Sequence, residues 1–555
     1  MIVRIKIPMI HPFRTSGKIF EHLLSNCHIL AIFALFVVVR TFSHFEYVTL
    51  GGDTCNYLSI ARSFPWHRLY NMELYLVHPP PFGYAIACFN IFLPLFASGL
   101  IVALLFAILS FWAIWRYSSN CGLNCFGVSF ALLYLGLNGT LAGFDSHVSR
   151  VSMLFFLTAM SLLCFEEYLK QGSRNLLLRV CIFNSLALLS SDQALSILPA
   201  QFVLVLSSWN RLKIKEICAV FTISLISYSI WPLVRLYIYL SNDFYPAGID
   251  GTIEILKPIS IKSVIQPNFL PFTNMHRSCF TSTEMNLKSL DIIGALGKLP
   301  ADILFLPRIL SAWLVSILAA LSLLRSAIKK DSRILALWII SVILYLPCFF
   351  GMNVWCGMGM AIPFSMILGK GAEQLFEIFK FNEKCFKHLI IVISAFLSLV
   401  WILGLGGDGA NTPLRPVGGI NFIFCRKTLT RVEGAVKYFP PQKDGECWMA
   451  PVTFTPEMLY LRDGKWIALP FDVELLEPII SEYKVAYIVL TDEFMLKSDN
   501  PMLKRAAHLD VVSHILSHPE RFSKVGEWIE MYPDCYASRK IYLFKIMPAE
   551  KRQDR

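Results

Sequence analysis

Charged side chains are scarce in this sequence. Only 16% of its 555 residues are Asp, Glu, Lys or Arg, whereas 55% are hydrophobic. Soluble domains average about a quarter charged residues and fewer apolar ones. The formal net charge of +11 would suggest a nucleic-acid partner in a soluble protein. In so apolar a chain the position of the charge matters more, and we expect no nucleic-acid partner.

The sequence also lacks the motifs of several enzyme classes. It has no Walker loop, no HExxH and no paired CxxC, and its 15 cysteines are scattered. Cys121 and Cys125 have the wrong spacing for a zinc site. The glycines of 357–371 follow no predicted strand, so they favour close helix packing over nucleotide binding. No DxD pair is visible, and we expect no cofactor and no essential metal.

Long apolar runs are what the sequence has in abundance. Runs of about 20 residues recur, which predicts an α-helical polytopic membrane protein. No cleavable signal peptide is evident, because the first run continues as a membrane anchor. We expect about eleven transmembrane helices, near 28–42, 98–115, 125–142, 151–168, 177–191, 194–209, 217–240, 301–324, 334–350, 357–376 and 389–406.

The basic residues between these runs predict the orientation. With a cytoplasmic N-terminus, every connection expected inside is basic, as the positive-inside rule requires. The outer loops are then 43–97 and 241–300, and the C-terminal region also lies outside. The inner basic residues are Arg116, Lys170, Arg174, Arg179, Arg211, Lys213, Lys215, Arg325, Lys329, Lys330, Arg333, Lys380, Lys384 and Lys387.

A change of composition predicts two parts. Residues 1–27 form a cytoplasmic N-terminus and 28–406 the membrane part, and 407–416 lie in a Gly- and Pro-rich linker. Residues 417–555 are more polar and predict a small extracytoplasmic α/β domain. Its expected strands are 447–452, 466–471, 485–491 and 540–546, and its expected helices lie near 472–484 and 501–518.

Asp53 is the leading candidate for chemistry on the outer face. It lies in the long loop after the first apolar run, before an amphipathic run of Tyr57, Ile60, Ala61 and Phe64. A carboxylate near a membrane face is costly to bury and is often functional. The alternative is a turn-forming acid that caps the next helix.

Other outer-face residues are weaker candidates for binding a phosphate or a sugar. Asp145, His147 and Arg150 lie together at a helix start, where a capped helix with an interfacial arginine is the simpler interpretation. His78 precedes a stiff run of three prolines. His276 and Arg277 lie in the large loop, where solvated side chains are the default.

Several motifs together resemble the GT-C membrane glycosyltransferases, especially the bacterial branch of protein O-mannosyltransferases and aminoarabinose transferases. The motifs run from Gly52-Asp53-Thr54 through Tyr57 and Ala61 to His78-Pro79-Pro80 and Tyr84. Three further stretches are similar to the family: Ser149–Phe156, Leu186–Pro199 and Tyr483–Leu490. The likeness in architecture covers most of the chain, and its motifs lie mainly in the first two hundred residues or so.

The resemblance implies an inverting transferase in a bacterial inner membrane. Such an enzyme moves a sugar from a polyprenyl-phosphate donor to a lipid, glycan or protein acceptor on the outer face. Asp53 would be the general base, because a carboxylate can accept the proton of an acceptor hydroxyl. His78 and Arg150 match family positions near the leaving phosphate, where cations stabilise developing charge.

The sequence departs from the family at three places. Thr54 replaces a second acid, Leu189-Ser190-Ser191-Asp192 replaces a Leu-Thr-Lys hairpin, and Met358-Gly359-Met360…Pro363 replaces a late Arg-Tyr…Pro motif. A divergent enzyme or an inactive assembly protein for lipid-linked glycans therefore stays open. A transporter or flippase is a further alternative, which the uncharged helix centres count against.

Overall fold

The computed structural model describes most of the helical part and a C-terminal sheet. The described residues are 26–46, 52–62, 81–137, 141, 148–207, 214–241, 306–329, 331–349, 358–403, 433–443, 445–451, 458, 465–470, 473–491, 509–531 and 538–548. The basic N-terminus, most of the 241–300 loop and the 407–416 linker fall outside these ranges.

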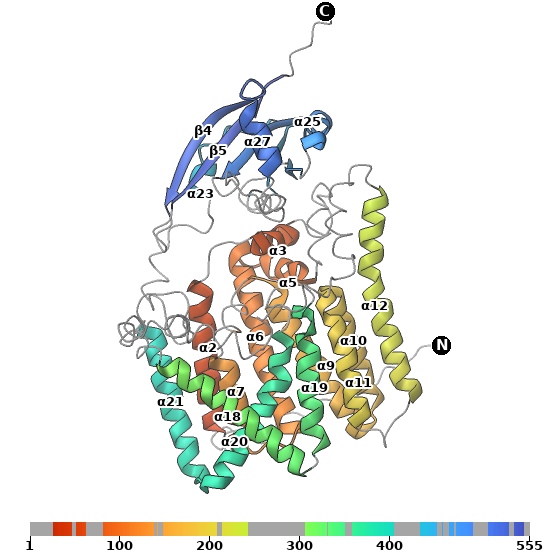
Figure 1. The fold of residues 1–555 in the computed structure, drawn as a ribbon, viewed down its shortest axis with the longest axis vertical. Coiled ribbons are helices and arrows are strands. Elements are labelled where there is room, and N and C mark those ends of the chain that lie inside the picture. The colour runs from red at the N-terminus through yellow and green to blue at the C-terminus, as the bar shows by residue number, and fades with distance from the viewer. Residues whose placement is uncertain are drawn as a thin grey trace, which may run out of the picture.

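A bundle of helices makes up the larger part of the molecule (Figure 1). Each predicted span coincides with a helix, and the ends differ by a few residues. The helices are α2 (Cys27–Glu46), α6 (Leu95–Asn120), α7 (Cys125–Leu137), α9 (Arg150–Gln171), α10 (Arg174–Ser190), α11 (Ile197–Ser207), α12 (Ile214–Ser241), α18 (Leu306–Lys329), α19 (Ser332–Phe349), α20 (Ala361–Phe379) and α21 (Glu383–Leu403).

Two of these helices, α6 and α9, are long and apolar enough to cross a membrane by length and composition. Shorter apolar helices lie at Cys27–Thr41, Cys125–Leu137, Gln193–Ser207 and Ser332–Tyr345 among the described residues. α9 is the inner helix of the pair, since 83% of its most apolar window is buried against 39% for α6. A membrane crossing by all of the predicted helices stays a prediction.

Glycines allow three helices to approach one another closely. A Cβ at Gly369 of α20 would lie 2.5 Å from the carbonyl oxygen of Gly127 in α7. A Cβ at Gly371 would overlap the backbone of Leu318 in α18. Small residues at such crossings let helix backbones pack directly. The interpretation of these glycines as helix-packing residues is confirmed.

A buried polar network joins α9, α10, α11 and α12. Asn184 accepts from Ser161 at 2.6 Å and donates to Gln201 Oε1 at 3.0 Å and to Ser224 at 3.1 Å. The amide of Gln201 returns a hydrogen bond to Ser161 Oγ at 2.8 Å. All four side chains are fully buried. In an apolar setting such satisfied networks fix which helix faces meet.

The C-terminal part is built on one mixed sheet of order β2-β1-β3-β5-β4. β1 runs parallel to β2 and β3, and β5 runs antiparallel to β3 and β4. The strands are β1 (Cys447–Ala450), β2 (Lys465–Ala468), β3 (Val485–Thr491), β4 (Phe522–Met531) and β5 (Ser538–Ile546). The short helices are α23 (Glu433–Val436), η5 (Val473–Leu475), α25 (Leu476–Tyr483) and α27 (Leu509–Ser517).

Strand β4 was not predicted from the sequence. It is an edge strand that carries Lys524 and Glu527, and Val525 and Ile529 are at least half exposed. A register shift between Lys524 and Gly526 interrupts its pairing with β5. Charged residues and bulges are common on edge strands, and they weaken the apolar alternation by which a strand is recognised.

We predict that Gly371→Leu destabilises the protein. The new side chain overlaps the backbone of α18, so α18 and α20 must separate at a cost of about 1–3 kcal/mol. Thermal unfolding of purified protein, followed by tryptophan fluorescence, measures the effect. Gly136→Ala in α7 is the matched control, because its Cβ would meet nothing within 4 Å. Equal unfolding temperatures for Gly371→Leu and wild type would contradict the close crossing.

We also predict an acid-sensitive contact in the C-terminal part. Arg521 donates two hydrogen bonds to Glu477, at 2.9 and 2.7 Å, which lower the pKa of that carboxyl. The stabilisation is therefore complete above the unfolded pKa of about 4.3 and is lost as the pH falls through the lower folded pKa. Glu477→Gln should lower the unfolding temperature at neutral pH. It should have no effect at a pH low enough to protonate Glu477 in both the folded and the unfolded protein. A difference that does not change with pH would contradict this assignment.

Candidate functional site

A pocket opens where α9 and α20 begin and α19 ends. The cavity itself measures about 20 Å³, room for about one water molecule, and the rest of the hollow is open to solvent. Three stretches that the sequence analysis singled out form most of its wall: the start of α9, the hairpin after α10 and the turn before α20. The lining residues are Val151, Leu154, Phe155, Thr158, Gln193, Ala194, Ser196, Leu344, Met358 and Gly359.

The periodicity of α9 builds one wall of this pocket. Val151, Leu154, Phe155 and Thr158 follow the i, i+3, i+4, i+7 spacing of a single helix face. Ser149 caps the helix by accepting a hydrogen bond from the backbone N–H of Val151 at 3.4 Å. The pocket face of α9 therefore begins directly after Arg150, the first residue of the helix.

Small residues and polar side chains complete the pocket. Gly359 lies beside the Thr158 methyl group and Leu344, each 3.7 Å from where a Cβ would be. Ser191 caps the 3₁₀ helix η2 (Asp192–Ser196), which supplies Gln193, Ala194 and Ser196. The lining is therefore an apolar wall with a few polar groups.

The helix that carries Asp53 packs close to this region. α3 (Gly52–Arg62) buries Tyr57, Leu58, Ile60 and Ala61, and it rests on α5 (Pro81–Asn90) and α6. A Cβ at Gly99 of α6 would meet both Leu58 and Val148, which precedes α9 by two residues. Figure 1 places α3 and α5 at the end of the bundle that faces the C-terminal sheet.

Only two of the predicted site residues belong to described elements. The backbone of Asp53 lies in the first turn of α3, and Arg150 begins α9. The roles of both remain predictions. His78, Asp145, His147, His276 and Arg277 lie outside the described residues. Thr158, Gln193 and Ser196 line the pocket but were not predicted from the sequence. The i+7 relation of Thr158 to Val151 was the available signal for the first of them.

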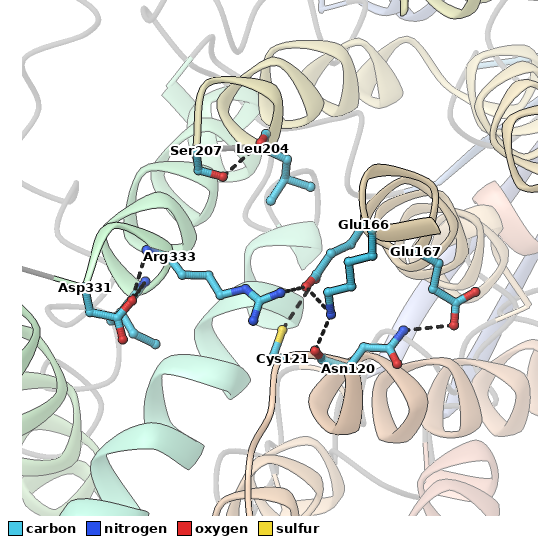
Figure 2. Close-up of polar contacts among 10 residues, drawn as sticks. Asn120, Cys121, Glu166, Glu167, Leu204, Ser207, Asp331 and Arg333 are labelled. Atoms are coloured by element: carbon cyan, nitrogen blue, oxygen red, sulfur yellow. Dashed lines mark hydrogen bonds and ion pairs between the residues drawn. The ribbon is translucent and has the colours of Figure 1, made fainter. Parts of the chain in front are cut away.

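A buried carboxylate lies near the other end of α9. Glu166 is 5% exposed and pairs with Arg333 of α19 at 2.5 Å and with Lys170 at 3.1 Å (Figure 2). The thiol of Cys121 donates to the same carboxylate at 3.6 Å. Burial, and then the charge of Glu166, raises the pKa of Cys121, so the thiol stays protonated and can donate.

Neighbouring contacts extend this cluster to the end of α6. Lys170 also donates to the backbone carbonyl of Asn120 at 2.5 Å, and the Asn120 amide donates to Glu167 at 2.8 Å. Arg116 lies 3.8 Å from Glu167. The cluster therefore ties the last turn of α9 to α6 and to the start of α19. Since α9 and α19 both line the pocket at their other ends, these contacts help to set the position of its walls.

Among known proteins, the chain matches solved structures. No protein-family model matches the chain, and no curated protein matches it. Two crystal structures of ArnT from Cupriavidus metallidurans are similar to it. The apo structure aligns at 13% identity with a TM-score of 0.40, over 92% of this chain and 97% of that chain. The structure bound to undecaprenyl phosphate aligns at 12% identity with a TM-score of 0.40, over 95% and 98%.

The chain has a structural match to ArnT along most of its length, at low sequence identity.

We predict that Arg333→Met destabilises the protein by about 1–3 kcal/mol. The substitution leaves the buried Glu166 carboxylate with less compensation for its lost hydration. Arg325→Met is the matched control, because Arg325 pairs at 2.6 Å with Glu377, whose side chain is 54% exposed. Loss of an exposed pair costs under about 1 kcal/mol. Equal shifts in unfolding temperature for the two variants would contradict the importance of the buried cluster.

Proposed function

We propose that this protein is a membrane glycosyltransferase. It moves a sugar from a polyprenyl-phosphate donor to a lipid, glycan or protein acceptor on the outer face of a bacterial inner membrane. One observation carries the proposal: the pocket. Residues of Ser149–Phe156 and Leu186–Pro199, which resemble the family, line it, and so do residues of Met358–Pro363, which stands where the family has an Arg-Tyr…Pro motif that this chain lacks.

The chemistry of the pocket suits such a donor. The apolar side of α9 at this hollow offers a surface along which the first part of a polyprenyl chain can lie, and Gln193, Ser196 and Thr158 offer polar groups beside it. Arg150 directly precedes the first lining residue on α9. A cation there, together with the positive end of the helix dipole, favours a phosphate at the mouth of the pocket.

Asp53 supplies the base in this proposal. Its carboxylate takes the proton of the acceptor hydroxyl, and the acceptor oxygen attacks the anomeric carbon of the sugar from the face opposite the phosphate. The bond between that carbon and the carrier phosphate oxygen breaks, and the phosphate leaves with the electron pair. The products are the inverted glycoside, the free carrier phosphate and protonated Asp53. The position of α3 beside the segment that leads into α9 supports this role.

We predict that Asp53→Asn lowers transfer by at least about 100-fold, because the amide cannot accept the proton. Purified protein in lipid nanodiscs is tested with a panel of radiolabelled polyprenyl-phosphate sugars, and transfer or slow hydrolysis is measured. Asp510→Asn, an exposed acid at the start of α27, is the control and should keep wild-type turnover.

The outcomes separate the remaining interpretations. Full activity of Asp53→Asn would remove Asp53 as the base. Binding of a polyprenyl-phosphate sugar without turnover, even with candidate acceptors present, would indicate an inactive protein of glycan assembly. Absence of binding by the wild-type protein would contradict the proposed function and favour transport or assembly.

A further inference from the structure

Two histidines lie on one face at the end of α27, in the C-terminal part of the chain. His514 and His518 are four residues apart, and their ring centroids are 4.1 Å apart with an angle of 32° between the planes. Both side chains are partly exposed. Two imidazoles at i and i+4 can reach a single metal ion from one helix face, as they do in zinc-binding helices.

The hydrogen bonds of His518 use one ring nitrogen and leave the other able to bind a metal ion. Its Nδ1 lies 2.9 Å from the backbone carbonyl oxygen of His514 and 3.1 Å from Ser517 Oγ. A carbonyl oxygen only accepts, so Nδ1 carries the proton and Nε2 keeps its lone pair for a metal. Metal-binding histidines are commonly oriented by such a hydrogen bond to a backbone carbonyl.

The ring of His514 is open to a ligand, since its side chain is partly exposed. Within the described part of the chain, the ring nitrogens of His514 make no hydrogen bond. Arg521, which follows His518 by three residues, donates two hydrogen bonds to Glu477. Neutral imidazole is the form that binds metals.

We propose that His514 and His518 bind one divalent transition-metal ion through one nitrogen of each ring, with water completing the coordination. Imidazole ligands suit Zn²⁺, Ni²⁺ and Cu²⁺ rather than Mg²⁺ or Ca²⁺. The described residues hold no group of three or more His, Cys, Asp or Glu that fits a metal. A site with two protein ligands and water differs from a closed structural zinc site, which has four protein ligands.

The ion would strengthen the connection between α27 and β4. The backbone carbonyl of His518 accepts hydrogen bonds from the N–H groups of Arg521 at 3.0 Å and Phe522 at 2.9 Å, where β4 begins. A metal ion bound by both rings would hold His518 against the last turn of α27. This proposal is independent of the glycosyltransferase activity, since neither histidine lines the pocket.

Isothermal titration of untagged, full-length protein in detergent with ZnCl₂ tests the proposal. We expect one saturable Zn²⁺ per chain, with affinity at least tenfold weaker in His514→Asn and in His518→Asn. Electron paramagnetic resonance of the Cu²⁺-loaded protein provides a second measurement, and it should show two nitrogen ligands in wild type and fewer in each variant.

His388 of α21 provides the matched control. Its Nδ1 lies 2.7 Å from the carbonyl oxygen of Lys384, the same backbone contact that His518 makes, but residue 384 is not a histidine. His388→Asn should leave Zn²⁺ binding unchanged, and Lys384→His should add a second site. Binding that persists in the His514→Asn/His518→Asn double variant, or the absence of saturable binding by correctly folded wild-type protein, would overturn the proposal.

Discussion

The buried carboxylate of Glu166 is the contact on which the position of α9 depends. A charge in a largely apolar bundle needs partners to replace its hydration, and Arg333, Lys170 and Cys121 provide them from three places in the chain. The same helix carries Ser161 of the polar network at its middle and the pocket face at its other end. α9 is therefore fixed along its length by directional contacts, although most of its surface is apolar.

Much of the fold could be predicted from the sequence. The apolar runs located the long helices, because length and hydropathy are local properties. Strands β1, β2, β3 and β5 were also expected, since their apolar residues are continuous or alternate clearly. β4 was missed because an exposed edge strand with Lys524 and Glu527 has neither signal. The sequence predicted that the glycines of 357–371 favour close helix packing, but it could not tell which helices meet at Gly369 and Gly371.

Less of the candidate site could be predicted. The sequence selected the stretches around Arg150, Asp192 and Met358 separately, but it held no information on their distance from one another. That they form one pocket follows from the packing of α9, α19 and α20. The contacts of Glu166 could not be predicted from the sequence either, because Arg333 was interpreted only as an inner-loop cation. Its partner is 167 residues away in the chain.

Locating a carrier lipid on the protein tests the proposed function most directly. An electron cryo-microscopy structure in nanodiscs with added polyprenyl phosphate would do so. The account predicts lipid density along Val151, Leu154 and Phe155, with the phosphate at the start of α9 beside Arg150. Lipid bound between other helices, with this pocket empty at saturating lipid, would contradict it.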